Sequence, residues 1–131
     1  MARKKRILTK GQLEAKISEY FSRFEKGYMG RGPLEIKTYI LDTILLIRLK
    51  GILTAAELKM VKSDDGNEAR NAIKKVRIAL LESARSQLEH DIRSLTRSKV
   101  ISMHTDLSTA TGEKIIVFTL DRFPEVGLEA E

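Results

Sequence analysis

The segment LEIKTYILDTILLIRLK, residues 34–50, restricts the fold most strongly, because apolar residues alternate with other residues through most of it. Alternation is typical of β-strands that have one face in a core. Asp42 and Thr43 fit a tight turn, so the segment predicts two strands that pair antiparallel. One face is expected to carry Leu34, Ile36, Thr38, Ile40, Leu45, Ile47 and Leu49, and the other Glu35, Lys37, Tyr39, Ile44, Leu46, Arg48 and Lys50.

The last third of the chain predicts a second pair of strands, KVISMHTDL and KIIVFTLD, joined by a loop that contains Gly112. In the first of them, Ile101, Met103, Thr105 and Leu107 alternate with Ser102, His104 and Asp106. The second strand is apolar on both faces, which favours a central position in the sheet or a covered second face.

Two capping boxes mark helix starts. Thr9 with Gln12, and Thr54 with Glu57, each place a threonine three residues before Glu or Gln, and leucines flank both boxes. The first helix is expected to close at Gly27, and the helix after Thr54 to be short, because SDDG at residues 63–66 interrupts it. A long helix over residues 67–97 should bury Ile73, Val76, Leu80, Ala84, Leu88, Ile92 and Leu95.

The element order is therefore helix, strand, strand, short helix, long helix, strand, strand. It predicts a two-layer α+β fold with a four-stranded, mostly antiparallel sheet and helices on one face. Residues 1–8 are expected to form a basic flexible tail, residues 9–121 a single α+β domain, and residues 122–131 a loose C-terminal tail.

Charge and composition narrow the function classes. The chain of 131 residues has a net charge of +6, and Arg3, Lys4, Lys5 and Arg6 supply four of its 24 basic residues. This tail is expected to be a solvated terminus, although it also suits phosphates of nucleic acid or anionic lipid. The absence of cysteine excludes disulfides and thiolate chemistry. No apolar run reaches the length of a membrane span, so we expect a soluble, cytoplasmic protein.

A second basic cluster, Arg70, Lys74, Lys75 and Arg77, lies early in the predicted long helix. We interpret it as a solvated helix face, with an anion or partner site as the alternative.

The glycine-rich stretch FEKGYMGRGP, residues 24–33, does not have the order of a phosphate loop, because its glycines follow a helix and precede a strand. A helix stop and a turn is the better interpretation. Arg31, between Gly30 and Gly32 and before Pro33, is left open to contact an anion or a partner.

His104 and Asp106 share one face of a predicted strand, a spacing that suits metal ligation or an aspartate that orients a histidine base. His90 is too distant in sequence to be placed beside them, so we predict a hydrogen-bonded polar strand face, no metal and no cofactor. Ser108 and Thr109, before Gly112, have no evident base partner besides His104.

The sheet face opposite the helices is predicted to be an interface. It carries an apolar patch of Tyr39, Ile44, Leu46, Ile115 and Val117, with a rim of Glu35, Lys37, Arg48, Lys50, His104 and Asp106. A polar-rimmed apolar patch usually marks an interaction surface. A homodimer, or another protein partner, is expected to cover it.

Three stretches, KGQLEAKISEYFSRFEKGYMGRGPLEIKTYIL, IRLKGILTAAE and SKVISMHTDLSTATGEKIIVFTLD, resemble the MpsC-like family over about residues 10–121. The family's label is a Na+-translocating, membrane-potential-generating system. The resemblance implies an accessory protein of a membrane ion-transport or inorganic-carbon uptake system, located in the cytoplasm or peripheral to the membrane. The residues that match its motifs, and are therefore binding candidates, are Gly30, Arg31, Gly32, Pro33, His104, Asp106, Ser108, Thr109 and Gly112.

Three functions remain open from the sequence. The first is a non-enzymatic accessory or regulatory protein that docks a membrane-transport protein or a second copy. The second is a nucleic-acid-binding protein that uses the basic tail and the Arg70–Arg77 cluster. The third is a small-molecule or enzymatic site around His104 and Asp106, although we expect no catalytic residues.

Overall fold

The computed structural model of the chain describes residues 7–63 and 66–127. The basic tail of Arg3–Arg6, the Asp64–Asp65 part of the predicted helix break and residues 128–131 lie outside these ranges. The elements are α1 (Lys10–Tyr28), β1 (Glu35–Leu41), β2 (Ile44–Lys50), α2 (Ala55–Val61), α3 (Gly66–Ser83), α4 (Arg85–Thr96), β3 (Val100–Ser108) and β4 (Glu113–Leu120). The α+β class and the predicted order are confirmed.

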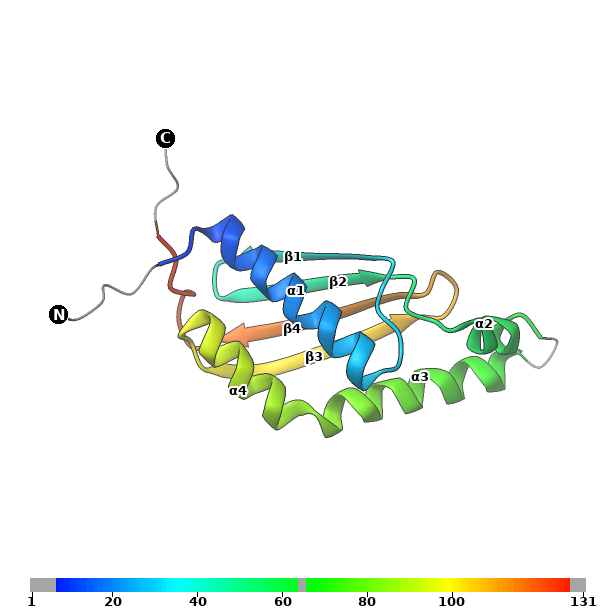
Figure 1. The fold of residues 1–131 in the computed structure, drawn as a ribbon. Helices are drawn as coiled ribbons and strands as arrows, with labels where there is room; N and C mark the ends of the chain where they lie inside the picture. Colours follow the sequence, from blue (N-terminus) through cyan, green and yellow to red (C-terminus); the bar gives the residue numbers. More distant parts are fainter. Residues whose placement is uncertain (1–6, 64–65, 128–131) are drawn as a thin grey trace.

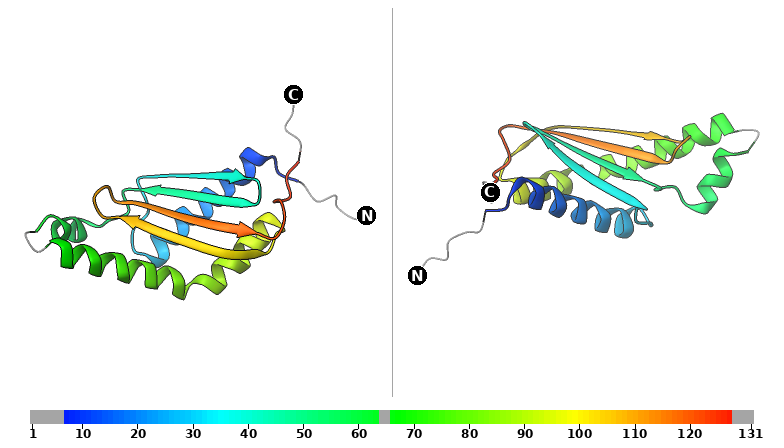
Figure 2. Two further views of the ribbon diagram at one scale, coloured as in Figure 1. Left: turned by 180° about the vertical axis from the view of Figure 1, so that it is seen from behind. Right: turned by 90° about the horizontal axis from the view of Figure 1, so that it is seen from above.

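The four strands form one antiparallel sheet in the order β1-β2-β4-β3, so the two hairpins meet along β2 and β4. All helices lie on one side of the sheet, as predicted (Figures 1 and 2). We call the side beneath the helices the covered face and the opposite side the open face. The expected central strand is β4, which is paired on both of its edges.

Helix α1 is fixed at its start by the predicted capping box, in which Thr9 Oγ1 accepts from the Gln12 N–H at 3.2 Å. Leu13, Ile17 and Phe21 repeat every four residues and are fully buried against the covered face. Two polar contacts attach α1 to the edge strand β1: Glu14 accepts the free Ile40 N–H at 2.8 Å, and the hydroxyls of Ser18 and Thr38 are 2.8 Å apart. The contact with Glu14 satisfies an edge N–H that would otherwise be free to pair with another chain.

The long helix predicted for residues 67–97 is wrong as one element. The chain bends at Ala84, whose N–H bonds the Leu81 carbonyl three residues back, and α3 and α4 run in different directions (Figure 1). Val76 and Leu80 are exposed rather than buried, because the buried row of α3 is Ile73, Arg77 and Leu81. A pattern of apolar residues cannot report this bend, since alanine carries no breaking signal.

Three further expectations about single positions were wrong. Gly27 lies inside α1, which continues to Tyr28, and the positive φ of 90° falls on Gly30 instead. Leu34 precedes β1 and is exposed, with its side chain close over Gly51. Ile101 points outward because the register of β3 shifts between Val100 and Ser102.

The two ends of the described chain lie side by side beyond the end of α4 (Figure 1). Thr9 and Gly127 form a parallel bridge, and the Gly127 N–H donates to the Leu8 carbonyl at 2.7 Å. The Glu125 N–H donates to the carbonyl of Thr96 at 2.9 Å. These contacts join the C-terminal segment to both α1 and α4.

Candidate functional site

The open face carries the predicted interface residues in adjacent rows across the sheet. One row aligns Tyr39, Leu46, Val117 and His104 on the four strands, and the next aligns Lys37, Arg48, Ile115 and Asp106. Tyr39, Leu46, Ile115 and Val117 are half-buried by their neighbours and Ile44 is exposed, although no helix lies over them (Figure 2). Whether another molecule covers these residues stays a prediction.

Most rim charges of the open face have a partner within the chain. Arg48 Nε lies 2.7 Å from Glu113 Oε2, and Lys50 Nζ lies 3.5 Å from Glu35 Oε2. Lys37 Nζ lies 5.1 Å from the centre of the Tyr39 ring, a cation–π distance. Beside them, Glu35, Lys37, Tyr39 and Arg48 line a shallow cleft of about 260 Å³. The rim is therefore close to neutral, which suits a protein surface of mixed charge better than a phosphate backbone.

His104 and Asp106 both lie on the open face, as predicted, but the structure gives Asp106 another partner. Lys74 Nζ of α3 is 2.8 Å from Asp106 Oδ1, and the Leu107 N–H also donates to this oxygen. The hydrogen bond from Lys74, with that from the backbone, holds the pKa of Asp106 below its ordinary value. Within the described ranges, no hydrogen bond joins His104 to Asp106, and no three His, Asp or Glu side chains gather to hold a metal ion.

The remaining binding candidates belong to two turns that meet the segment after β2. From the first turn, Arg31 donates to the Leu53 carbonyl at 3.2 Å, while Gly30 supplies the positive φ. In the second turn, Ser108 accepts the Thr111 and Gly112 N–H groups and Gly112 has a φ of 73°, with its carbonyl accepting the Ile52 N–H. The two turns thus share residues 52–53 as a partner, and His104 and Asp106 lie apart from them on the open face.

A buried charged network lies next to these turns, and the sequence analysis missed it. Lys114 Nζ of β4 is 2.6 Å from Glu25 Oε1 of α1, and both side chains are buried. Arg77 of α3 contacts both carboxylate oxygens of Glu57, at 2.8 and 2.6 Å, and donates to the Ile52 carbonyl. The network links α1, α2, α3 and β4 on the covered side.

Burial governs the electrostatics of this network. It lowers the pKa of Lys114 against the opposing effect of Glu25, and the nearby Arg77 lowers it further. Burial alone would raise the pKa of Glu57, but hydrogen bonds from Arg77 and from the Thr54 N–H outweigh it and leave the pKa below its ordinary value. Glu25 Oε2 is buried with no hydrogen-bond partner among the described residues.

The solvated-face interpretation of the Arg70–Arg77 cluster is wrong for Arg77, which is 6% exposed. Lys74 is engaged with Asp106, and Arg70 donates to the Val61 carbonyl and to Asn67, so only Lys75 of the four is exposed without such a contact within the described ranges. The cluster is thus mostly a set of contacts within the protein.

Comparisons with known proteins identify one family and one relative. The signature of the family described as "Na+-translocating membrane potential-generating system (MpsC)" matches residues 9–122. The chain is also 42% identical, over 92% of its own length and 95% of the relative's, to the uncharacterized protein YbcI of Bacillus subtilis (strain 168). No solved structure matches the chain at a significant level. Within residues 7–63 and 66–127, no helix is both long and apolar enough to cross a membrane.

Proposed function

Because the chain belongs to the family described as Na+-translocating membrane potential-generating system (MpsC), we propose that it is a non-enzymatic accessory protein of a membrane ion-transport system. It acts by docking through the open face rather than by moving ions itself. The observation that carries this proposal is the apolar centre of Tyr39, Leu46 and Val117, over which no helix of the described residues lies.

A second copy of the chain is the occupant that the open face suits best. A two-fold interface brings one surface against itself, so it must be complementary to its own charges. Three cations, Lys37, Arg48 and Lys50, and three carboxylates, Glu35, Asp106 and Glu113, surround the apolar centre, so the rim can meet an identical rim without a large excess of one sign. We therefore propose a homodimer through the open face as the form in which the protein meets a transport protein.

Leu46→Glu tests this function directly. A carboxylate in the centre of a buried apolar patch costs several kcal/mol of association free energy, so the variant should be monomeric at concentrations where the wild type is dimeric by analytical ultracentrifugation. Its unfolding midpoint should stay near that of the wild-type monomer, because Leu46 is not part of the core beneath the helices. Ala15→Glu is the matched control, since it adds the same single carboxylate to an exposed position of α1, on the other side of the sheet.

A wild-type chain that remains monomeric at high concentration, or a Leu46→Glu variant that dimerises as well as the wild type, contradicts the homodimer. Cross-linking in membrane fractions then tests the transport partner. A cross-link from an open-face position to an ion-transport protein, lost in Leu46→Glu and kept in Ala15→Glu, supports the accessory role.

The alternative functions have weaker support. Arg77, which the nucleic-acid hypothesis needs at the surface, is buried against Glu57. The enzymatic hypothesis needs Asp106 beside His104, but Asp106 binds Lys74.

A further inference from the structure

The surface beyond the end of α4 is built from segments that lie far apart in the sequence. Arg122, after β4, donates to the Arg97 carbonyl at 2.7 Å, and Ser98 Oγ donates to the Phe123 carbonyl at 3.1 Å. The Asp121 and Lys99 backbones are also joined by a hydrogen bond, at 2.9 Å. With the pairing of Leu8 and Gly127, these bonds fix the relative positions of exposed side chains there. We define the α4 end as Ile7, Arg93, Arg97, Lys99, Arg122, Phe123 and Val126.

Four cations of the α4 end, Arg93, Arg97, Lys99 and Arg122, are exposed. None forms an ion pair with a carboxylate of the described residues, whereas Arg23, Arg48 and Arg85 do; exposed lysines elsewhere, such as Lys26, Lys59 and Lys75, are also without one among those residues. The carbonyl end of a helix favours nearby cations, which accounts for Arg93 and Arg97. It also accounts for Arg122, whose guanidinium donates to the Arg97 carbonyl, but not for Lys99 or for the apolar residues between these cations.

Three apolar side chains of the α4 end are exposed to solvent. Phe123 is 66% exposed, Ile7 51% and Val126 40%. Single exposed apolar residues are common on proteins, but a group of them among unpaired cations is characteristic of surfaces that enter the interface of a bilayer.

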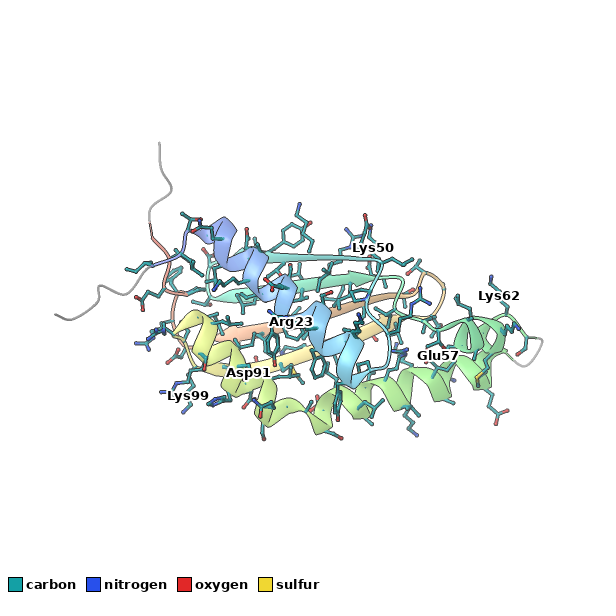
Figure 3. The ribbon with its side chains drawn as sticks, viewed as in Figure 1. Arg23, Lys50, Glu57, Lys62, Asp91 and Lys99 are labelled. Atoms are coloured by element: carbon teal, nitrogen blue, oxygen red, sulfur yellow. The ribbon has the colours of Figure 1, made fainter. Side chains whose placement is uncertain are left out.

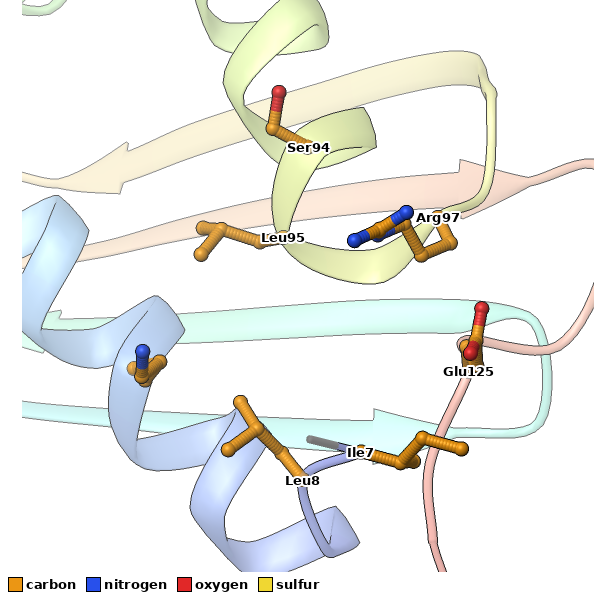
Figure 4. Close-up of a pocket in the computed structure, with 7 residues that line it drawn as sticks. Ile7, Leu8, Ser94, Leu95, Arg97 and Glu125 are labelled. Carbon is orange, nitrogen blue, oxygen red and sulfur yellow. The ribbon is translucent and has the colours of Figure 1, made fainter. Parts of the chain in front are cut away.

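A cleft of about 350 Å³ lies at the same end, between α1, α4 and the C-terminal segment (Figure 4). Ile7, Leu8 and Leu95 give it apolar walls, and Arg97 and Lys16 add cations to its lining. The carboxylate of Glu125 is also part of its lining. The lining of the cleft thus combines apolar side chains with cations, as the surface of the α4 end does.

The α2 end is the nearest counterpart of the α4 end in character. About α2 and the start of α3, it exposes two cations, Lys59 and Lys62, and two apolar side chains, Leu58 and Met60. The cations that follow in α3 are mostly engaged, because Arg70 donates to the Val61 carbonyl and Lys74 pairs with Asp106. The α4 end differs in its aromatic side chain, since Phe123 is 66% exposed among cations without a carboxylate partner in the described residues.

We propose that the α4 end binds the surface of an anionic bilayer. Arg93, Arg97, Lys99 and Arg122 contact lipid phosphates, and Phe123, Ile7 and Val126 enter the interfacial region between them. The phosphates of a nucleic acid would contact the cations, and one of its bases could stack on Phe123, but nothing in it would bury the aliphatic Ile7 and Val126. A lipid surface contacts both the cations and the apolar side chains. This binding is independent of the open face, so the protein can dimerise and lie on a membrane at once.

The test measures binding of the full chain to vesicles of phosphatidylcholine with about one third phosphatidylglycerol, and to vesicles of phosphatidylcholine alone. The wild type should bind only the acidic vesicles, and binding should weaken with salt. Arg93→Glu with Lys99→Glu should lower the partition constant at least about 30-fold, since each basic residue near such a surface contributes about a fivefold effect. Phe123→Ser should lower it about fivefold to tenfold through lost apolar burial.

Lys59→Glu with Lys62→Glu is the matched control, because it changes the net charge equally at the α2 end; Figure 3 shows Lys62 and Lys99 at opposite ends of the molecule. It should bind acidic vesicles within about twofold of the wild type. Equal loss in this control, or no binding of the wild type to acidic vesicles, overturns the proposal. So does tight binding to duplex DNA that requires Arg93 and Lys99 but is unchanged in Phe123→Ser, since that result assigns the α4 end to nucleic acid.

Discussion

The two faces of the sheet use the same four strands in opposite ways. On the covered face, the buried polar groups of Thr38 and Lys114 each have a partner from α1, Ser18 for Thr38 and Glu25 for Lys114. On the open face, apolar side chains lie without a helix above them, and the charges pair sideways, as Arg48 does with Glu113. The alternation of a β-strand places both kinds of residue one position apart.

The two faces should therefore contribute to different free energies, that of unfolding and that of association. Contacts on the covered face are made within the chain, so changes there should alter the free energy of unfolding. Residues of the open face make few contacts within the chain, so changes there should mainly alter the free energy of association. Substitutions on the two faces should therefore have different measurable effects.

The largest effect is expected from Lys114→Met on the covered face. This substitution removes the counter-charge of the buried Glu25 carboxylate. The second oxygen of that carboxylate already has no hydrogen-bond partner among the described residues. Removing one member of a buried ion pair typically costs about 3–5 kcal/mol. Urea unfolding at neutral pH should show this loss.

The double variant Lys114→Met with Glu25→Leu is the control for that prediction. Replacing both charges by apolar side chains removes the desolvation cost of each, so its stability should return to within about 1 kcal/mol of the wild type, or exceed it. A double variant as unstable as Lys114→Met would mean that the pair provides more than mutual charge compensation.

A smaller effect is expected from Glu57→Gln, which keeps an oxygen for the Thr54 cap but removes the charge that Arg77 contacts. Hydrogen bonds to a charged partner contribute about 1.5–3 kcal/mol, and this one should be lost at neutral pH. The pKa of Glu57 is lowered in the folded protein. The charge of Glu57 therefore stabilises the folded state fully at pH values above the ordinary pKa of a glutamate. This stabilisation disappears as the pH falls through the folded pKa, because the unfolded chain binds the proton first.

The stability difference between wild type and Glu57→Gln should therefore be largest at neutral pH and shrink as the pH falls below the ordinary pKa of a glutamate. Urea unfolding across this range measures it. A difference that stays constant with pH would show that the charge of Glu57 is not what stabilises the contact with Arg77.

Much of the fold could be predicted from the sequence because its signals are local. The caps at Thr9 and Thr54 each depend on a residue three positions away, and the β1–β2 hairpin on two turn residues. The alternation in the strands also assigned Tyr39, Leu46 and Val117 to the face opposite the helices. Where a bulge changes the alternation, at Ile101, the assignment was wrong.

The buried charges could not be predicted because their partners are distant in sequence. Glu25 and Lys114 are 89 residues apart, and only the tertiary fold brings them together. A signal was nevertheless present: Glu25 continues the four-residue spacing of Leu13, Ile17 and Phe21, and Lys114 shares the alternation of Ile116 and Phe118. A charged residue at a position that the apolar period assigns to the core needs a partner there, and two such residues of opposite sign are candidates for each other.

The smallest effect should come from Asp106→Asn on the open face. The ion pair of Asp106 with Lys74 is exposed to solvent, and exposed pairs contribute at most about 1 kcal/mol. The contact with Lys74 lowers the pKa of Asp106, so any stabilisation it gives is present above the ordinary pKa and is lost as the pH falls through the folded one. Urea unfolding of Asp106→Asn should thus resemble that of the wild type, in contrast to Lys114→Met. A loss as large as that of Lys114→Met would mean that the open face, like the covered one, holds contacts on which folding depends, and the division between the two faces would fail.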